Sequence, residues 1–181
     1  MKKLVIAASV VAALTSVSAV QAASTGTITF DGLLTATTCD VSVADQGADA
    51  TVVLPTIGTN QLTGATQTAG RTGFNMALTN CAGTLHTASA FFEAGTTVDV
   101  VTGRLYNIGG TASNVELQLR DASNAAHAVI QVGNTNQVNK TTYVDVSTGS
   151  ATLPYAVEYY ATDATTAGTV KSSVIYSIQY K

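Results

Sequence analysis

Apolar and polar residues alternate along the last fourteen positions of the chain. Val174, Tyr176, Ile178 and Tyr180 occupy every second position, and most residues between them are polar, up to Lys181 at the end. A period of two is typical of a β-strand with one face in a core. Because no residue follows Lys181, we expect the far edge of this strand to lack a partner from later in the chain. A bare apolar edge promotes aggregation unless something covers it.

The same alternation recurs in short runs along the rest of the chain. It predicts strands at residues 27–34, 51–54, 74–78, 90–92, 98–101, 115–119, 128–132 and 153–159. Turn-forming residues separate these runs, and two polar stretches, 59–70 and 133–142, are expected to be loops. No convincing amphipathic helix follows the first twenty residues. Many short strands at regular spacing predict an all-β sandwich.

The first 22 residues have the three parts of a secretory signal peptide. Lys2 and Lys3 form the basic start, residues 4–14 the apolar stretch, and residues 20–22 (Val-Gln-Ala) a small-residue cleavage site. A transmembrane anchor is the alternative, but the apolar run is too short to span about 30 Å of hydrocarbon. We therefore expect export, with cleavage after residue 22 or after Ala23.

The chain contains two cysteines, Cys39 and Cys81. An even number of cysteines in an exported chain predicts a disulfide, and two free buried thiols are the alternative. A bond between them would close a loop of 42 positions, which the chain-entropy model values at about 4 kcal/mol. We expect this bond to join the first two strands of the core.

Charge and candidate chemistry narrow the function. Only 10% of residues are charged, the net charge is −3, and loss of Lys2 and Lys3 would make it two units more negative. Nothing resembles a basic patch, which argues against nucleic acid as a partner. His86 and His127 stand apart, outside any nucleophile or metal-ligand motif, so we predict no enzymatic activity, no metal and no cofactor. A weakly charged surface rich in hydroxyl groups suits packing against copies of the same chain.

Four stretches carry recognisable motifs. Residues 32–39 run from a glycine to the first cysteine, residues 73–81 read Gly-Phe-Asn-Met-Ala-Leu-Thr-Asn-Cys, and residues 159–162 read Tyr-Tyr-Ala-Thr. The fourth is a glycine fourteen residues from the end, followed by alternating apolar residues and a penultimate tyrosine: Gly168, Val174, Tyr176, Ile178 and Tyr180. Together they resemble the pilin subunits of chaperone–usher fimbriae, and look closest to the major subunit of type 1 fimbriae.

This resemblance implies a fold and a division of the chain. Pilins of this family have an incomplete immunoglobulin-like sandwich that lacks its last strand, which leaves a groove between the first and the carboxyl-terminal strands. A donor strand from another subunit completes the sandwich by strand addition. Applied to this chain, the resemblance implies a signal peptide at 1–22, an amino-terminal donor-strand extension at 23–34 and a pilin domain at 35–181.

The resemblance also assigns roles to residues. Ile28, Phe30, Gly32 and Leu34 would form the donor strand, with Gly32 at a position where a side chain would clash with the groove floor. The five carboxyl-terminal residues from Gly168 to Tyr180 would form the acceptor groove and the strand that binds the chaperone. The alternative for residues 27–34 is an ordinary first strand, paired within its own chain.

The function expected from the resemblance is that of a structural subunit of a surface fimbria that supports cell adhesion. Its partners would be copies of itself, other pilin subunits, a periplasmic chaperone and an outer-membrane usher, and it would reach the cell surface through the periplasm. A minor adaptor or tip-fibrillum pilin is the alternative, because the extension before Cys39 is short. A monomeric secreted carbohydrate-binding β-sandwich is more distant, since it needs clustered aromatic residues and Tyr106, Tyr143 and Tyr160 are scattered.

Overall fold

The structure, a computed structural model, describes residues 26–34, 36 and 38–181. The chain divides into two compact units, residues 1–33 and residues 34–181. The described part of the first unit, residues 26–33, forms no helix or strand. The predicted signal peptide and both candidate cleavage sites lie outside the described residues.

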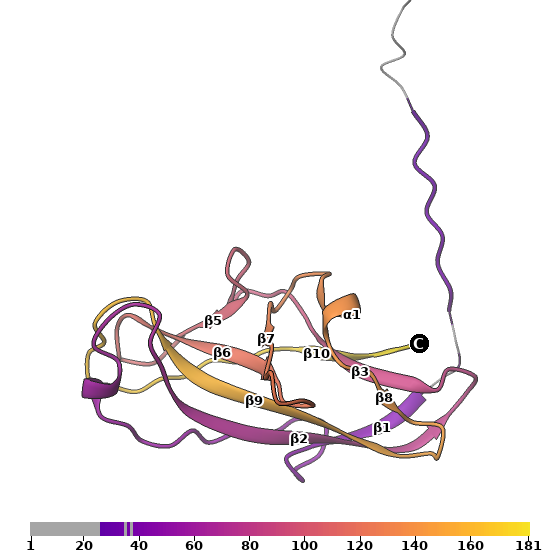
Figure 1. The fold of residues 1–181 in the computed structure, drawn as a ribbon, viewed down its shortest axis with the longest axis horizontal. Coiled ribbons are helices and arrows are strands. Elements are labelled where there is room, and N and C mark those ends of the chain that lie inside the picture. Colours follow the sequence, from indigo (N-terminus) through magenta and orange to yellow (C-terminus); the bar gives the residue numbers. More distant parts are fainter. Residues whose placement is uncertain (1–25, 35, 37) are drawn as a thin grey trace, which may run out of the picture. The chain divides into compact units, whose positions relative to one another are not determined.

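Seven antiparallel strands form the larger sheet of the second unit (Figure 1). Six of them follow one another across the sheet in the order β1-β2-β9-β6-β5-β4, and β7 pairs with β6 beside this path. The strands are β1 (Thr38–Val43), β2 (Thr68–Ala82), β4 (Val98–Asp99), β5 (Arg104–Tyr106), β6 (Val115–Asp121), β7 (Val129–Ile130) and β9 (Ala151–Ala161).

The smaller sheet has three antiparallel strands in the order β10-β3-β8. They are β10 (Tyr176–Tyr180), β3 (Thr87–Phe92) and β8 (Val144–Asp145). Two short helical turns complete the described elements: the 3-10 turn η1 (Thr59–Gln61) and the α-helical turn α1 (Gln137–Lys140).

Side chains from both sheets form one hydrophobic core. Met76 and Leu153 come from the larger sheet, Ala90 and Phe92 from the smaller, and all four are buried. The Phe92 ring meets the Tyr155 ring edge-on, with 5.1 Å between the centroids, a favourable arrangement for aromatic pairs. The predicted all-β sandwich is therefore confirmed, with the core between its two sheets.

The alternation of apolar residues located the long strands correctly. The runs at 74–78, 90–92, 115–119 and 153–159 lie within β2, β3, β6 and β9. In β6, Leu117 and Leu119 join the core. Glu116 and Gln118 lie at the intervening positions, which face the other side of the sheet.

Residues 51–54 do not form the predicted strand. The side-chain amide of Gln46 donates to the Thr51 carbonyl (3.0 Å) and accepts from the Thr51 N–H (3.2 Å). Pro55 follows directly and has no N–H to offer a ladder. Val52 and Leu54 still pack against the core, so the apolar pattern reports burial here without strand pairing.

Other boundaries also differ from the prediction. β4 ends at Asp99, because the Asp99 carboxylate accepts the Val101 N–H at 2.9 Å and turns the chain. β7 is shorter than the predicted 128–132, and β2 begins at Thr68, inside the expected loop at 59–70. That loop and the one at 133–142 each contain a helical turn, η1 and α1. No predicted run covers β1, β5 or β8, although the expected disulfide places Cys39 on a core strand.

The run at 27–34 is not a strand of this chain either. Its apolar side chains are solvent-exposed: Ile28 is 76%, Phe30 87% and Leu34 100% accessible. A Cβ added to Gly32 would meet no heavy atom within 4 Å. The structure therefore assigns no strand to the described residues of this segment.

Candidate functional site: the free edge of the carboxyl-terminal strand

β10 is an outermost strand of the smaller sheet. β3 pairs with it on one side, from Tyr176 opposite Phe92 to Tyr180 opposite Ala88. No strand in the described part of the chain pairs with its other side. We call β10 and the segment that enters it, residues 170–180, the free edge.

Hydrogen bonds show which peptide groups of the free edge lack a strand partner. Lys181 exchanges both of its backbone hydrogen bonds with Thr87, at 2.9 and 3.0 Å, and the Ile175 carbonyl accepts from the Glu93 N–H at 2.8 Å. In an antiparallel pair every second residue bonds to the neighbouring strand, so the residues between point their N–H and C=O groups the other way. The groups that face away from β3 belong to Val174, Tyr176, Ile178 and Tyr180.

These four residues also turn their side chains toward the core. All four are half-buried and pack against core residues, whereas the intervening Ile175 is 75% exposed. Each of the four positions thus combines an apolar side chain that is incompletely covered with peptide groups that lack a strand partner. A strand lying alongside would supply hydrogen-bond partners for the peptide groups and would cover the apolar side chains.

β1 bounds the other side of this opening. It pairs with β2 on one side and lies at the edge of the larger sheet. The Tyr176 hydroxyl donates to the Ala48 carbonyl, just beyond β1, at 2.8 Å. Burial raises the pKa of Tyr180, and a hydrogen bond from the Cys39 backbone partly opposes this rise. Tyrosine hydroxyls therefore connect β10 to β1 and its continuation, where a strand would otherwise lie.

A disulfide fixes β1 in place. Cys39 of β1 and Cys81 of β2 are bonded, with 4.1 Å between their Cα atoms, and both side chains pack against the core. The predicted disulfide between the first two core strands is confirmed. The bond anchors the strand that faces the free edge and reduces the conformational freedom of the unfolded chain.

Gly168 lies where the chain enters the free edge and crosses the loop at 107–113. A Cβ on Gly168 would come within 2.7 Å of the Thr111 carbonyl carbon and closer still to the Ala112 nitrogen. The next residue, Thr169, is held by that loop, because its N–H donates to the Thr111 hydroxyl at 2.9 Å and its carbonyl accepts the Ala112 N–H at 3.0 Å. The glycine is needed here for the close approach of two backbones.

A pocket of about 510 Å³ opens at this end of the free edge. Gly168, Thr169 and Val170 line one side of it, and its volume is in the range of small-ligand sites. The remaining apolar lining comes from residues distant in sequence: Ile57, Leu62, Ala112, Val115 and Tyr159. We call it the end pocket.

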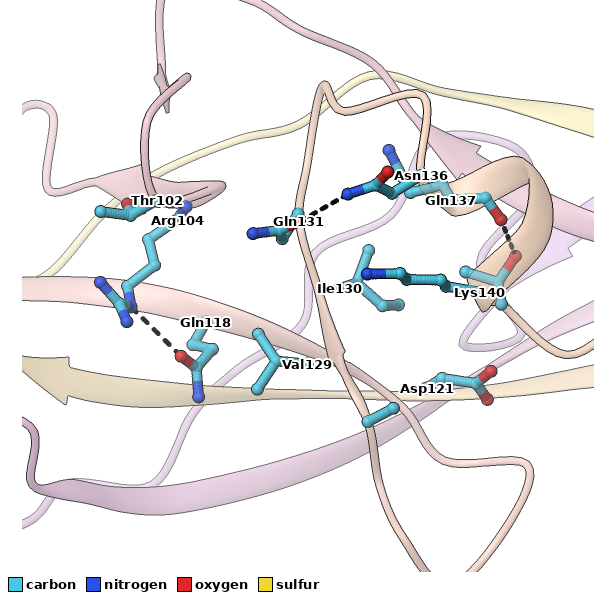
Figure 2. A pocket seen from close by; sticks show the side chains of 12 residues that line it. Thr102, Arg104, Gln118, Asp121, Val129, Ile130, Gln131, Asn136, Gln137 and Lys140 are labelled. Atoms are coloured by element: carbon cyan, nitrogen blue, oxygen red, sulfur yellow. Dashed lines mark hydrogen bonds between the residues drawn. The ribbon is translucent and has the colours of Figure 1, made fainter.

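A second pocket, of about 310 Å³, lies away from β10, against β5, β6, β7 and α1 (Figure 2). Its charged lining residues are Arg104, Lys140 and Asp121. The Arg104 guanidinium donates to the Gln118 side chain at 3.1 Å. Burial would raise the pKa of Asp121, but hydrogen bonds at Ser123 and Thr142 lower it. Arg104 and Asp121 already have partners, so the pocket shows no sign of a particular ligand.

All three arginines of the chain lie on the face of the larger sheet that points away from the core. Arg71 pairs with the buried Glu158 at 2.8 Å, and Arg120 pairs with its other carboxylate oxygen. Burial would raise the pKa of Glu158, but hydrogen bonds from these two arginines and from Gln118 lower it.

Glu116 lies on the same face, and its pKa is shifted in the opposite direction from that of Glu158. Burial raises its pKa, and the attraction of Arg104, 3.9 Å away, opposes this only in part. Its buried Oε2 has no hydrogen-bond partner among the described residues. The sheet face thus holds one carboxylate that is well paired and one that is poorly paired.

The structure locates all of the predicted site residues and shows the Cys39–Cys81 disulfide, but it tests none of the donor and acceptor roles. It brings Val174, Tyr176, Ile178 and Tyr180 onto one edge and shows a packing reason for Gly168. Sequence reasoning missed the residues that complete the opening and the end pocket. For β1 a signal was present, because Cys39, Val41 and Val43 alternate; for the lining at 57–62 there was none.

Two other kinds of site are not found within the described residues. No group of three or more histidine, cysteine, aspartate or glutamate side chains there could hold a metal ion. No helix in this part of the chain has the length and apolar character to cross a membrane.

Comparisons with known proteins agree with the fold. Residues 54–181 match the model of a family described as type-1 fimbrial protein, A. The chain is 45% identical to the major fimbrial subunit SMF-1 of Stenotrophomonas maltophilia (strain K279a), across 87% of this chain and 94% of that protein. It is 35% identical to the F17 fimbrial protein of Escherichia coli, across 86% and 87%.

A solved structure shows the same architecture. The P pilus rod subunit PapA superposes with a TM-score of 0.60 at 15% identity, covering 79% of this chain and 99% of PapA. The two-sheet sandwich is therefore the immunoglobulin-like fold of pilin subunits, as predicted.

Proposed function

This chain belongs to the family of type-1 fimbrial proteins and is a structural fimbrial subunit, and we propose that it polymerises by donating its amino-terminal extension to the free edge of another copy. The observation that carries the proposal is the free edge itself. Four alternate inward-facing residues, Val174 just before β10 and three within it, have half-buried apolar side chains and peptide groups that point away from β3. Such an edge is an acceptor for an added strand.

The extension has the properties of the donor. Ile28, Phe30, Gly32 and Leu34 lie at every second position, so in an extended conformation they share one face. The three apolar side chains are exposed in the chain that carries them. Inserting them beside the free edge would gain about 1.5–3 kcal/mol for each buried side chain. Each backbone hydrogen bond would add about 0.5–1.5 kcal/mol.

The register follows from the one small residue in the series. We propose that Gly32 lies where the donor backbone passes closest to the core, so a larger side chain at this position would prevent insertion. The end pocket would accept a side chain at the end of the donor strand that lies next to Gly168. A joint of this kind separates only when the acceptor partly unfolds, so it should be kinetically stable.

Export and assembly complete the proposal. Residues 1–22 direct export, residues 23–34 are the donor and residues 35–181 the pilin domain. A periplasmic chaperone covers the free edge until an outer-membrane usher delivers the subunit to a growing fimbria on the cell surface. The role is structural and supports adhesion, without catalysis, a cofactor or nucleic acid. The names of the relatives support the major shaft subunit; electron microscopy of cells lacking the chain should then show loss of the whole fibre.

The direct test uses two peptides that cover residues 23–36. One carries Gly32→Val and the other Asp31→Val, which adds the same side chain at the neighbouring position that faces away from the acceptor. Each competes with the unmodified labelled peptide for the freshly refolded mature chain. We expect the Asp31→Val peptide to compete as well as the unmodified peptide and the Gly32→Val peptide to fail.

Two results would contradict the proposal. If none of the peptides binds the subunit, β10 is not an acceptor. If both variants compete equally, the register is wrong. The full chain with Gly32→Val should stay folded yet fail to form fibres; if it unfolds instead, residues 27–34 belong to its own core.

A further inference from the structure

β3 has a second edge, and a strand covers only part of it. On the side away from β10, β8 pairs with Thr87 and Ala88. Farther along β3, no strand in the described part of the chain lies on this side. The N–H and C=O groups of Ala90 and Phe92 face it, because the residues between them bond to β10. This stretch of β3 could therefore accept a strand, as β10 can.

Side chains occupy this edge instead. The Phe92 N–H donates to Gln137 Oε1 at 3.0 Å, and Gln137 Nε2 donates back to the Phe92 carbonyl at 3.0 Å. The Ala90 N–H donates to the Tyr155 hydroxyl at 2.9 Å. A primary amide carries one acceptor and two donors, so Gln137 reproduces both hydrogen bonds that a residue of a paired strand would make.

Contacts around α1 hold Gln137 against β3. Gln137 is buried, with a relative exposure of 2%. The Thr141 hydroxyl donates to the Gln137 carbonyl at 2.7 Å, and the Ser89 hydroxyl of β3 contacts Thr141 at 3.1 Å. The Gly133 N–H donates to the same Phe92 carbonyl at 2.9 Å. Residues 133–141 therefore lie along the second edge, with Gln137 bonded directly to it.

We propose that Gln137 closes the second edge of β3, so that strand addition is confined to β10. The inference rests on the proposed function, because it matters only in a protein that assembles through strand addition. A subunit with one open edge and one donor forms an unbranched chain. A subunit with two open edges could also join side by side, and branched or aggregated material would result.

The matched control is Gln118. It is also a buried glutamine, 3% exposed, and its amide bonds to Arg104 and Glu158. It lies in β6, which has strand neighbours on both sides. Gln137→Ala and Gln118→Ala therefore remove the same buried amide, but only the first removes it from a sheet edge.

The experiment measures self-association of the mature chain with and without a saturating excess of the unmodified peptide of residues 23–36. With the peptide, β10 is occupied, so wild type and Gln118→Ala should sediment as monomers. Gln137→Ala should form dimers and larger species whose amount rises with protein concentration. Backbone hydrogen exchange in residues 90–92 should accelerate about tenfold in this variant alone.

The possible outcomes separate edge closure by Gln137 from ordinary packing. If Gln137→Ala stays monomeric with peptide bound, like Gln118→Ala, the inference is wrong. Equal loss of stability in both variants without association would make Gln137 an ordinary packing residue. Failure of the wild type to bind peptide would contradict the proposed function. In that case the self-association of the two variants, compared without peptide, would still show whether loss of Gln137 opens an edge. Gln137→Glu, which keeps the acceptor for the Phe92 N–H, should associate less than Gln137→Ala, and the opposite order would also overturn the inference.

Discussion

Two isoleucines on the same strand region offer a matched test of the free edge. Ile178 is half-buried and packs against the core, and its peptide groups face the open side. Ile175, three residues earlier, is 75% exposed, and its carbonyl accepts the N–H of Glu93, the residue directly after β3. Ile178→Asp and Ile175→Asp therefore make the same chemical change on opposite faces of the acceptor.

The expected effect of Ile178→Asp is large. A donor strand would finish burying the Ile178 side chain, which is already half-buried, so its loss costs roughly half of the value for full burial, about 1–1.5 kcal/mol of binding free energy. The new carboxylate would also lose water beneath the donor, where the surrounding groups are the apolar side chains of the core. A total of at least about 3 kcal/mol corresponds to binding weaker by about 100-fold or more. For Ile175→Asp we expect a change of less than about threefold, because exposed substitutions alter free energies by about 0.5 kcal/mol or less.

The assay is fluorescence anisotropy of a labelled peptide of residues 23–36, titrated with each refolded mature chain. Circular dichroism checks that both variants fold, since a change at the free edge should leave the strands of the larger sheet intact. The reasoning is refuted if Ile178→Asp binds the peptide as tightly as wild type. It is equally refuted if Ile175→Asp loses as much affinity as Ile178→Asp.

Three further predictions concern stability, measured by urea unfolding of the mature chain followed by circular dichroism. Glu158→Gln should destabilise the protein by about 2–4 kcal/mol at pH 7, because it leaves two arginines without their buried partner. The folded-state pKa of Glu158 is lowered, so its contribution to stability is present above the ordinary glutamate pKa of 4.5 and is lost as the pH falls through the lowered value. A stability difference between wild type and Glu158→Gln that stays constant at all pH values would count against this. Glu116→Gln should stabilise the protein by about 1 kcal/mol at pH 7. Its pKa is raised, so the carboxylate opposes folding at neutral pH and ceases to do so once protonated; a destabilised variant would show that the Arg104 contact outweighs burial. Gly168→Ala should cost about 1–3 kcal/mol through its clash with the 111–112 backbone and should slow peptide binding, whereas wild-type stability would contradict the packing argument.

The strands predicted correctly are those whose alternating side chains enter the core, including the short run at 90–92, whereas the longer run at 27–34, whose apolar side chains are exposed, forms no strand. In β2, β6 and β9 every second side chain is in the core, and these positions therefore need apolar residues. This requirement produces the alternation seen in the sequence. The carboxyl-terminal residues from Val174 to Tyr180 follow the same rule, which is why the free edge could be located in advance. The absence of a strand beside β10 could not be established from the sequence, because strand pairing is a property of the folded sheet.

Two places where a strand partner is absent have the same physical cause. At residues 51–54 and at the second edge of β3, a glutamine side chain takes the hydrogen bonds that a strand would take. A polar residue in a loop gives no sequence signal that its amide will bond to backbone groups, whether five residues away as for Gln46 or 45 away as for Gln137. Neither Gln46 nor Gln137 could therefore be recognised as a substitute for a strand, and the end pocket, which gathers residues from 56 to 170, was equally out of reach.

The position of the arginines and lysines affects how easily proteases can cut the subunit outside the cell. Beyond residue 22 the chain contains Arg71, Arg104, Arg120, Lys140, Lys171 and the terminal Lys181. The three arginines lie inside β2, β5 and β6, and the backbone of Lys171 is bonded on both sides to residues 107–108. A protease that cuts after basic residues needs a segment that can open locally, and the end of α1 at Lys140 is the one that best meets this need. Digestive proteases of the trypsin type should therefore find few places to start, and the first cut should fall at the turn that covers the second edge of β3.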